Sequence, residues 1–392
     1  MEEPELREIL ATVRDFVRNV VVPAEDDIEA SDEIPAAIKN AAAAMGLYGF
    51  AIPAEHGGLG LSLPDEVRLV FELGYAAPAF RSLFGTNNGI AGHVLLEGGT
   101  DKQRAEYLPR LASGEWTASF ALTEPEAGSD PSTLTTSARR VKGEGEAGGE
   151  WVITGTKRYI TNAPYADVFM VFARTDPQAP ASRGISALLV ERGSPGLSVG
   201  PKDRKMGQAG AVTADVSFDE VRVPAERLIG ELPGTGYATA MRCLAHGRIH
   251  IAALCVGLMQ RLVDESARWA VTRRQSGRPI GDFQLVQGML ADSQTDLMAG
   301  RGLVSEAARA YQAGEDRRTG PSCAKYFASE AVCRVADRAV QIHGGAGYMR
   351  GVPAERLYRD ARLFRIYEGT SQIQQQIIAR EVLRAAREEA AR

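Results

Sequence analysis

The sequence predicts an α+β multidomain protein with an N-terminal all-α domain, a middle antiparallel β sandwich or barrel, and a C-terminal domain resembling a four-helix bundle. Two patterns support this. Apolar residues recur at helical spacing at both ends of the chain, whereas the middle third has short β-branched or alternating runs separated by Gly, Pro and Asp. A chain of 392 residues is also too long for one ordinary core. We place the domains at residues 1–119, 120–230 and 231–392.

The first region begins with an apolar stripe at helical spacing over residues 6–17, which Pro23 ends or bends. A second helix is expected from Pro35 to Met45, with Asp32 as its cap. The glycine-rich segment 54–62 lacks the spacing and lysine of a phosphate-binding loop, so we interpret it as a turn between helices. Further helices are expected over residues 64–74, 81–96 and 101–115.

The middle region alternates or is β-branched in four runs, which predicts strands at 151–161, 167–174, 185–191 and 215–218. Residues 142–150 are interpreted as an exposed hairpin loop, and residues 221–230 lead out of the domain. The third region predicts long helices over 237–271, 282–312 and 322–343. A last helix from about Thr370 is expected to complete the bundle.

Composition narrows the function. The net charge is −5 and no basic stripe dominates any segment, so no nucleic-acid partner is expected. The four cysteines form no C-x-x-C pair, which favours free thiols in a reducing compartment. The acidic N-terminus is unlike a signal peptide and no run of about 18 apolar residues was found, so we expect no membrane span and, for a bacterial source, a cytoplasmic location. The arginines of residues 350–365 indicate a solvated helix face, or else an anion or subunit contact.

The usual catalytic and metal motifs are absent from the sequence. His246 and His250 have i,i+4 spacing, but neither HExxH nor a third nearby ligand accompanies them, so we interpret them as two unrelated helix histidines and expect no metal. No G-x-S-x-G elbow occurs, and no strand leads into G-x-G-x-x-G. A Rossmann-type dehydrogenase is therefore not expected.

Three segments carry candidate chemistry. In residues 121–130, ALTEPEAGSD, small and hydroxylated residues either grip a flavin or phosphate edge or simply form a capped turn. In residues 155–163, GTKRYITNA, Tyr159 either stacks on a planar cofactor or packs into the sheet core. Residues 341–374 contain a Gly-rich turn and then Glu368, in the run YEGTS between two helices. There, Thr370 is placed to cap the following helix.

These segments, together with RRQSGRPIGDFQ, resemble the acyl-CoA dehydrogenases, and the resemblance covers essentially the whole chain in the same order. It implies an FAD cofactor between the β domain and the C-terminal helices. It also implies a site shared between subunits, hence a homo-oligomer of at least two chains and, by family habit, a homotetramer. The implied FAD contacts are Phe120, Leu122, Thr123, Ser129, Tyr159, Thr161, Arg273, Gln284, Gln341, Gly344, Gly345, Thr370 and Gln372.

The resemblance makes Glu368 the catalytic base. It implies that Glu368 removes the α-proton of an acyl-CoA thioester while the β-hydride passes to flavin N5, which yields a trans-2-enoyl-CoA. A carboxylate in a desolvated cleft is a stronger base, which suits a weakly acidic α-carbon. The electrons then go to an electron-transferring flavoprotein. Implied substrate contacts are Ser129, Ser182, Arg248 and Gly369.

Some positions depart from the family pattern. Gly247 stands where other members carry the base on a long helix, which strengthens the assignment of Glu368. Ala245 replaces an aspartate that contacts CoA, and Ser276 a common phenylalanine. Ala209 and Ala211 stand where Arg and Ser are common. The alternatives are an acyl-CoA oxidase, an elimination enzyme such as a desulfinase, and a non-catalytic FAD- or CoA-binding homologue.

Overall fold

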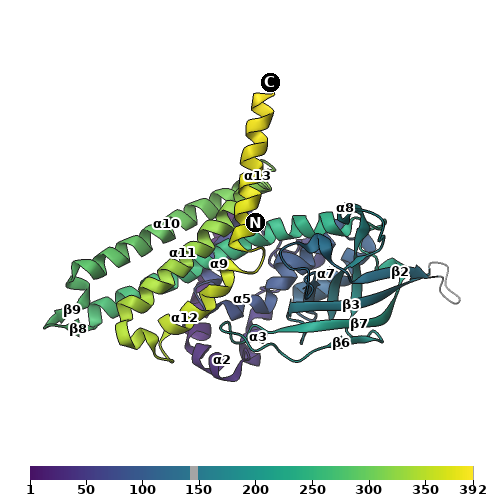
Figure 1. Cartoon of the computed structure of the whole chain (residues 1–392). Coiled ribbons are helices and arrows are strands. Elements are labelled where there is room, and N and C mark those ends of the chain that lie inside the picture. The colour runs from purple at the N-terminus through teal and green to yellow at the C-terminus, as the bar shows by residue number, and fades with distance from the viewer. Residues whose placement is uncertain (142–148, 392) are drawn as a thin grey trace.

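The computed structural model describes residues 1–141 and 149–391. Helices form both ends of the chain, and the strands between them in sequence form a curled sheet at the right of Figure 1, so the predicted class of fold is confirmed. The expected hairpin loop at 142–150 lies outside the described residues, apart from its last two positions.

The N-terminal region contains seven α-helices and four short 3-10 or π turns, labelled η. Their bounds are α1 (Glu3–Phe16), η1 (Val17–Val21), η2 (Val22–Ala24), α2 (Glu25–Ser31), α3 (Ala36–Ala44), η3 (Ala54–His56), α4 (Leu63–Leu73), α5 (Pro78–Gly85), η4 (Thr86–Ile90), α6 (Ala91–Gly98) and α7 (Asp101–Ser113).

Asp32 does not cap the second predicted helix. It ends α2 in a left-handed conformation, with φ of 52°, and Pro35 takes the N-cap position of α3. The Asp32 carboxylate instead accepts a hydrogen bond from the backbone N–H of Gly210, at 2.7 Å. The contact joins residues 178 positions apart, so local spacing could not reveal it.

The middle region is one seven-stranded sheet in the order β1-β4-β2-β3-β7-β6, with β5 also paired to β4. The elements are β1 (Ala118–Ala121), η5 (Pro131–Thr133), β2 (Ser137–Val141), β3 (Glu150–Thr161), β4 (Val168–Arg174), α8 (Ala181–Gly184), β5 (Ile185–Glu191), β6 (Leu197–Val199), β7 (Thr213–Pro224) and η6 (Ala225–Arg227).

Three strands of this sheet, β1, β2 and β6, were not predicted, because each has only three to five residues and little alternation. The pairing is also mixed. β1 and β2 both run parallel to β4, whereas the other pairs are antiparallel as expected. Whether two strands pair parallel or antiparallel depends on which distant segments meet. The sequence of one strand does not reveal its partner.

Strand β4 is buried on both faces and joins the sheet to the helices. Phe169, Val171 and Ala173 belong to the core inside the sheet. Met170 and Phe172 face the other way, into a core shared with α6, α7 and the first turns of α9 (Gly236–Thr272). This explains the unbroken apolar run VFMVFA, since a strand with one solvated face would alternate.

The C-terminal region holds the longest helices. Its elements are α9 (Gly236–Thr272), β8 (Arg274–Gln275), β9 (Arg278–Pro279), η7 (Ile280–Asp282), α10 (Gln284–Gln312), α11 (Thr319–His343), η8 (Gly344–Tyr348), α12 (Pro353–Ala361), η9 (Arg362–Arg365) and α13 (Ser371–Ala390).

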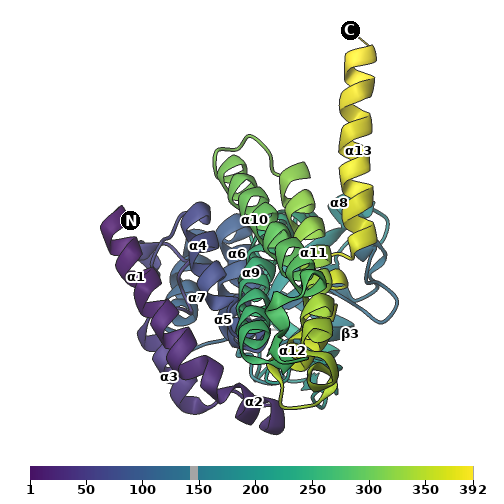
Figure 2. The same cartoon turned by 90° about the vertical axis from the view of Figure 1, so that its left-hand side faces the viewer.

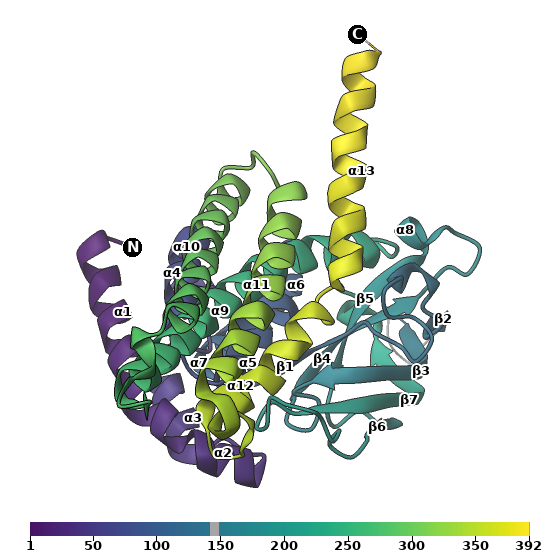
Figure 3. The ribbon, with the colours of Figure 1, turned by 60° about the vertical axis from the view of Figure 1, so that its left-hand side comes forward.

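The last helix does not complete a bundle within the subunit. α13 starts against α11 and then projects away from the body (Figures 1, 2 and 3), while α4 from the N-terminal region packs against both α9 and α10. The arginine-rich stretch is not a solvated face either, because α12 is tied to α2. Arg356 pairs with Glu25 at 2.7 Å, and Arg359 pairs with Glu29 at 2.8 Å.

Helix α9 is the centre of the helical core. By length and composition it could cross a membrane, with a mean hydropathy of 1.2 over 18 residues. However, 89% of that stretch is buried within the subunit, where α4, α10 and α11 surround it. A helix that is apolar on every side is expected at the middle of a large core.

The crossing of α4 and α9 depends on two glycines. A Cβ added at Gly257 would lie 2.4 Å from the Phe71 carbonyl oxygen, and one added at Gly74 would lie 2.6 Å from the Leu254 carbonyl oxygen. These neighbours are backbone atoms, which cannot move aside as a flexible side chain would. Absence of a side chain therefore sets how closely the two helices approach.

We expect Gly257→Ala to lower the free energy of unfolding by about 1–3 kcal/mol, the usual cost of overpacking a core. Gly302→Ala in α10 is the matched control, because a Cβ there meets nothing within 4 Å. It should stabilise the protein by roughly 0.5–1 kcal/mol through helix propensity alone. Urea denaturation of both variants measures the difference, and equal stability for the two would contradict the close-approach argument.

Candidate active site

Glu368 occupies a sharp backbone reversal between η9 and α13. Its φ is 55° and that of Gly369 is 87°, so two consecutive residues are left-handed. A non-glycine residue in this region is strained by about 1–3 kcal/mol, so the surrounding structure must hold it. The reversal turns the chain so that the side chain of Glu368 faces α9.

Buried donors on α11 and α13 hold this reversal. The Gln374 amide donates to the carbonyl oxygens of Glu368 and Gly369, at 3.2 and 3.0 Å. The Lys325 ammonium group donates to the Gly369 carbonyl at 2.7 Å. Thr370 accepts a hydrogen bond from the N–H of Ile373 and so caps α13, which confirms that predicted cap.

The Glu368 carboxylate is enclosed but incompletely bonded. Its Oε2 is buried and has no hydrogen-bond partner among the described residues. A Cβ built on Gly247 of α9 would lie 3.3 Å from this oxygen. Gly247, the position at which the resemblance places the base of some members, therefore adjoins Glu368, and its lack of a side chain leaves the space free.

Opposing effects set the basicity of Glu368. Burial raises the pKa of its carboxyl group above the ordinary 4.5, and the positive charges of Arg81, Arg248 and Lys325 act against that rise. Burial also lowers the pKa of Lys325 to about 8 and lowers the pKa of Arg248 from its ordinary value. The Nε of Arg248 is buried without a partner among the described residues. The site thus combines a strengthened base with an unsatisfied donor.

A second group of predicted residues gathers where β1 meets β3. Residues 121–130 continue from β1, and the N–H of Arg158 donates to the Thr123 carbonyl at 2.9 Å. A register shift in β3 between Lys157 and Ile160 leaves Tyr159 with a φ of 57° and a 60% exposed side chain. Tyr159 is therefore not a core aromatic, although the Arg158 guanidinium lies over its ring, 4.9 Å from the centroid.

The other predicted residues of this group lie close to those strands. Ser119 of β1 donates to the carbonyl of Thr161 at 2.7 Å, which ties the two strands together. Phe120 is partly exposed, Leu122 is buried and Ser129 is exposed. The group thus presents hydroxyls and aromatic surface beside one another.

A buried ion pair fixes the loop of this group. Lys157 donates to the Glu124 carboxylate at 2.8 Å and to the Leu122 carbonyl at 3.1 Å. The same carboxylate accepts the N–H groups of Thr135 and Thr136. Because every bond lies inside the protein, the loop cannot relax without leaving a buried charge unpaired.

A third group lies at the far end of the helical region and is solvent-exposed. Arg273 and Gln284 flank the β8–β9 hairpin, and Gln341, Gly344 and Gly345 end α11. Stacked rings of Trp269 and His343, with centroids 5.0 Å apart, bring the ends of α9 and α11 together. No hydrogen bond or ion pair between described residues links this third group to Glu368.

The remaining predicted positions are dispersed. Gln372 is exposed at the start of α13, and Ser182 is exposed on α8 at the edge of the sheet. Ser276, in the β8–β9 turn, is also exposed and has a φ of 50°. Ala211 is buried against the N-terminal helices. These placements assign no role to any of the four.

The prediction that His246 and His250 are unrelated is wrong. Both approach one carboxylate oxygen of Glu66 on α4, at 3.5 and 2.6 Å. Two histidines and a glutamate within 4.8 Å of one another have the composition of a metal site. The 2.6 Å contact, however, is a hydrogen-bond distance, and Arg81 already occupies the Nδ1 of His250, at 3.1 Å. The arrangement fits a hydrogen-bonded cluster better than a coordination sphere.

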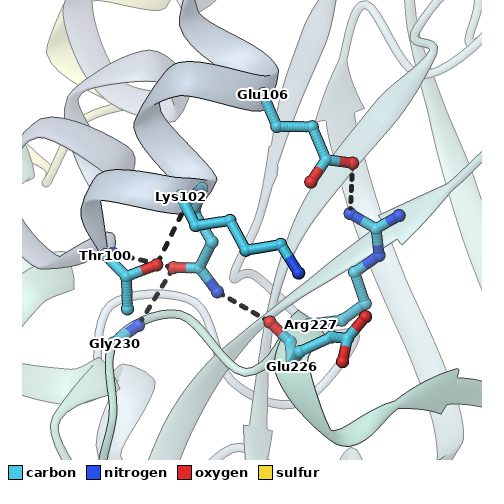
Figure 4. A pocket seen from close by; sticks show the side chains of 7 residues that line it. Thr100, Lys102, Glu106, Glu226, Arg227 and Gly230 are labelled. Carbon is cyan, nitrogen blue, oxygen red and sulfur yellow. Dashed lines mark hydrogen bonds and ion pairs between the residues drawn. The ribbon is translucent and has the colours of Figure 1, made fainter.

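A small surface cavity of about 130 Å³ lies elsewhere, between the start of α7 and η6 (Figure 4). The Gln103 amide donates across it to the carbonyl oxygen of Glu226, at 2.9 Å, and Arg227 pairs with Glu106. These polar groups already bond to one another, and none of the predicted site residues lines the cavity. These bonds therefore join α7 to η6, and the cavity is not part of the Glu368 site.

The second and third groups suit the two parts of a flat cofactor that has a phosphate-bearing tail. Tyr159 offers a 60% exposed side chain, and Thr123, Ser129 and Thr161 have side chains that are partly or fully exposed. At the end of α11, a Cβ on either Gly344 or Gly345 would meet nothing within 4 Å, so the backbone there is open to a close approach. The residues present therefore fit a flavin ring in one place and a phosphate-bearing tail in the other.

Family models match nearly the whole chain. The N-terminal, middle and C-terminal domains of acyl-CoA dehydrogenase match residues 3–115, 119–221 and 234–383. A 3-(aryl)acrylate reductase of Clostridium sporogenes is 39% identical over 98% of this chain and 99% of its own. The caffeyl-CoA reductase-Etf complex subunit CarC of Acetobacterium woodii is 37% identical, over 95% and 96%.

Solved structures agree in fold. Butyryl-CoA dehydrogenase from Megasphaera elsdenii has a TM-score of 0.91 and 31% identity, covering 96% of this chain and 98% of its own. The FAD complex of PigA has a TM-score of 0.91 and 27% identity, covering 97% and 98%. The chain therefore belongs to the acyl-CoA dehydrogenase family, whose members are FAD-dependent oxidoreductases acting on CH–CH bonds.

Proposed function

We propose that this enzyme uses FAD to dehydrogenate an acyl-CoA thioester at Cα and Cβ, yielding a trans-2-enoyl-CoA, with Glu368 as the base. One observation supports this above all: the pKa of the Glu368 carboxyl group is raised, and its buried oxygen Oε2 has no hydrogen-bond partner among the described residues. A structural glutamate would normally be paired or solvated. A free oxygen in a dry site is what proton abstraction requires.

The residues around Glu368 have separable tasks. Glu368 accepts the α-proton at its free carboxylate oxygen. The backbone N–H of Glu368 has no partner among the described residues and can donate to the thioester carbonyl, where negative charge develops. Arg248 brings a cation to the same place, with its Nε unpartnered. Bound FAD supplies the acceptor for the β-hydride.

We propose that FAD is held by all three groups, two from one subunit and one from its partner. Tyr159, Thr161, Thr123 and Ser129 would contact the ring region. Arg273, Gln284, Gln341, Gly344 and Gly345 would contact the tail of FAD bound in the neighbouring subunit. Their exposure at the far end of the helices supports this division, since a residue serving only its own subunit's site should lie near Glu368.

Exposed apolar residues support a homo-oligomer, which we propose to be a tetramer. Leu285 and Met298 of α10 are 85% and 66% exposed, and Val382 and Leu383 of α13 are 60% and 53% exposed. Such residues on projecting or outer helices are typical of surfaces covered by another chain. The projection of α13 (Figure 2) is consistent with contact to a neighbour.

The relatives bear on the direction of the flavin reaction and on the protein that exchanges electrons with the flavin. We propose oxidation with an electron-transferring flavoprotein as acceptor, supported by the Etf complex in which the relative CarC takes part. Two relatives described above are named reductases, so enoyl reduction is the second candidate. The same carboxyl group would then deliver the α-proton. All four cysteines are free, which supports our proposal of a cytoplasmic location.

Anaerobic titration tests the reaction. Purified flavin-loaded enzyme should bleach with at least one member of a panel of straight, branched and aromatic acyl-CoAs. Glu368→Gln should retain FAD and fold yet show no bleaching, because the amide cannot accept a proton. No bleaching of the wild type by any acyl-CoA, together with no reoxidation of its chemically reduced flavin by any enoyl-CoA, would favour a non-catalytic binding protein. Rapid reoxidation by air with peroxide formation would favour an oxidase.

The pH dependence follows from the raised pKa of Glu368. The base works only when ionised, so dehydrogenation is fully present above that pKa and is lost as the pH falls through it. Because the shift is upward, the acid limb of kcat/KM should lie above pH 4.5, the ordinary value for glutamate. Steady-state rates across the acid range measure it, and a limb at or below 4.5 would place the base elsewhere.

Arg273→Ala tests the shared site. We expect a lower flavin content and a shift toward smaller oligomers, because the exposed guanidinium would be lost from the neighbouring subunit's FAD. Arg7→Ala, which removes an exposed arginine paired with Glu3 on α1, is the control. The absorbance ratio at flavin and protein wavelengths and the mass from light scattering are the readouts. Unchanged values for Arg273→Ala would contradict the cross-subunit contact.

A further inference from the structure

Three buried polar residues form a row behind Glu368. Arg81 of α5 contacts His250 of α9, with 3.1 Å between Nη2 and Nδ1. His250 contacts Glu66 of α4, with 2.6 Å between Nε2 and Oε2. All three side chains are buried, and His250 is fully so. The proposed reaction gives none of them a task.

The chemistry of arginine fixes the direction of these hydrogen bonds. A guanidinium group can only donate, so Nδ1 of His250 must accept. Nε2 of His250 therefore carries the hydrogen and donates it to Glu66. Burial raises the pKa of Glu66, but His246 and His250 more than offset this, and the pKa lies well below its ordinary value. The Glu66 carboxylate thus accepts a hydrogen bond from His250, and His250 accepts one from Arg81.

Arg81 lies against the glycines of η4 and its surroundings. A Cβ on Gly85 would be 2.5 Å from Nη1 of Arg81, and one on Gly89 would be 3.0 Å from Nη2. The next residue, Ile90, adjoins Gly247, where a Cβ would lie 2.8 Å from Ile90 and 3.3 Å from Oε2 of Glu368. A short series of contacts through Gly89, Ile90 and Gly247 therefore connects the surroundings of Arg81 with those of Glu368.

Arg81 and Glu368 nevertheless do not pair. No hydrogen bond or ion pair joins them in the described part of the chain, yet Nε of Arg81 and Oε2 of Glu368 are both buried and unpartnered. Of the three cations that oppose the raised pKa of Glu368, Arg81 has the largest effect. Opposite charges in a dry interior gain from a charge-assisted hydrogen bond, so the lack of such a bond points to a restraint on one of them.

We propose that His250, backed by Glu66, is a positioning residue that holds the Arg81 guanidinium away from the Glu368 carboxylate and so keeps one oxygen of the base free for substrate. The proposal rests on the function of Glu368 proposed above. A carboxylate paired to Arg81 would be a weaker base, and its free oxygen would be occupied. The row therefore regulates the base without touching the substrate.

Other charged or titratable groups also face Glu368. They are Arg248 on α9, Lys325 on α11 and the adjacent Tyr367. Lys325 is already bound to the Gly369 carbonyl. None of these groups is altered in the variants below, so a changed titration of Glu368 reports on the row alone.

The test compares two substitutions at one position in the holoenzyme. His250→Leu removes both hydrogen bonds, whereas His250→Gln keeps an acceptor for Arg81 and a donor for Glu66 on one side chain. The readout is the pH titration of the infrared carboxyl band that disappears in Glu368→Gln. We expect the pKa of Glu368 to fall by about 1 pH unit or more in His250→Leu, as when an arginine pairs with a carboxylate. His250→Gln should stay near the wild type.

Glu66→Gln keeps a side chain of similar shape beside His250 but removes the negative charge. It is the alternative variant if His250→Leu does not fold. It should also lower the pKa of Glu368, because the Arg81 charge is then less compensated. Glu265→Gln is the control, since it removes a carboxylate from α9 that pairs with Arg261 and Arg268. An unmoved carboxyl titration in folded His250→Leu or Glu66→Gln would overturn the proposal.

Kinetics separate this proposal from the proposed function. In an active enzyme, the acid limb of kcat/KM should move down with the carboxyl titration in His250→Leu and recover in His250→Gln. Turnover with an unmoved limb would overturn the positioning role alone. A shifted carboxyl titration in an enzyme that oxidises or reduces no CoA thioester would support the positioning and overturn the reaction.

Discussion

The structure depends on keeping one carboxylate dry. Removing an anion from water is costly, and the protein meets that cost at Glu368 with cations from three helices rather than with a direct ion pair. Burial strengthens the base, while the nearby charges keep it from being permanently protonated. A direct salt bridge would reverse this balance, since it would stabilise the anion at the expense of its basicity.

Backbone strain serves the same end. Glu368 and Gly369 are both left-handed, and buried hydrogen bonds from Gln374 and Lys325 hold the reversal. Those donors come from α11 and α13, so the long helices do more than fill a core. They fix the direction in which the side chain leaves the backbone. Residues held in a sparsely populated conformation are frequent where precise placement matters for function.

All three parts of the fold contribute residues to the proposed site or to its surroundings. α9 supplies Gly247, Arg248 and His250 along a short stretch of one buried helix. The sheet supplies Tyr159 through a register shift that turns its ring outward, and a buried Glu124–Lys157 pair fixes the neighbouring loop. No single domain holds the site. The proposed site draws on residues of both the helices and the sheet, and the family matches extend over nearly all of the chain.

The sequence alone determined the order of helical and β regions, the long C-terminal helices and the Thr370 cap, because these depend on local periodicity and spacing. It also singled out Glu368 by its motif. It missed the short strands and the parallel pairing of β1 with β4, since strand partners are distant in sequence. Only the tertiary structure brought Glu66 to His246 and His250, bonded Arg81 to His250 rather than to Glu368, and showed that α13 projects rather than closing the bundle. Those features arise from contacts between residues far apart in the chain, and burial and charge act through space, which local pattern does not encode.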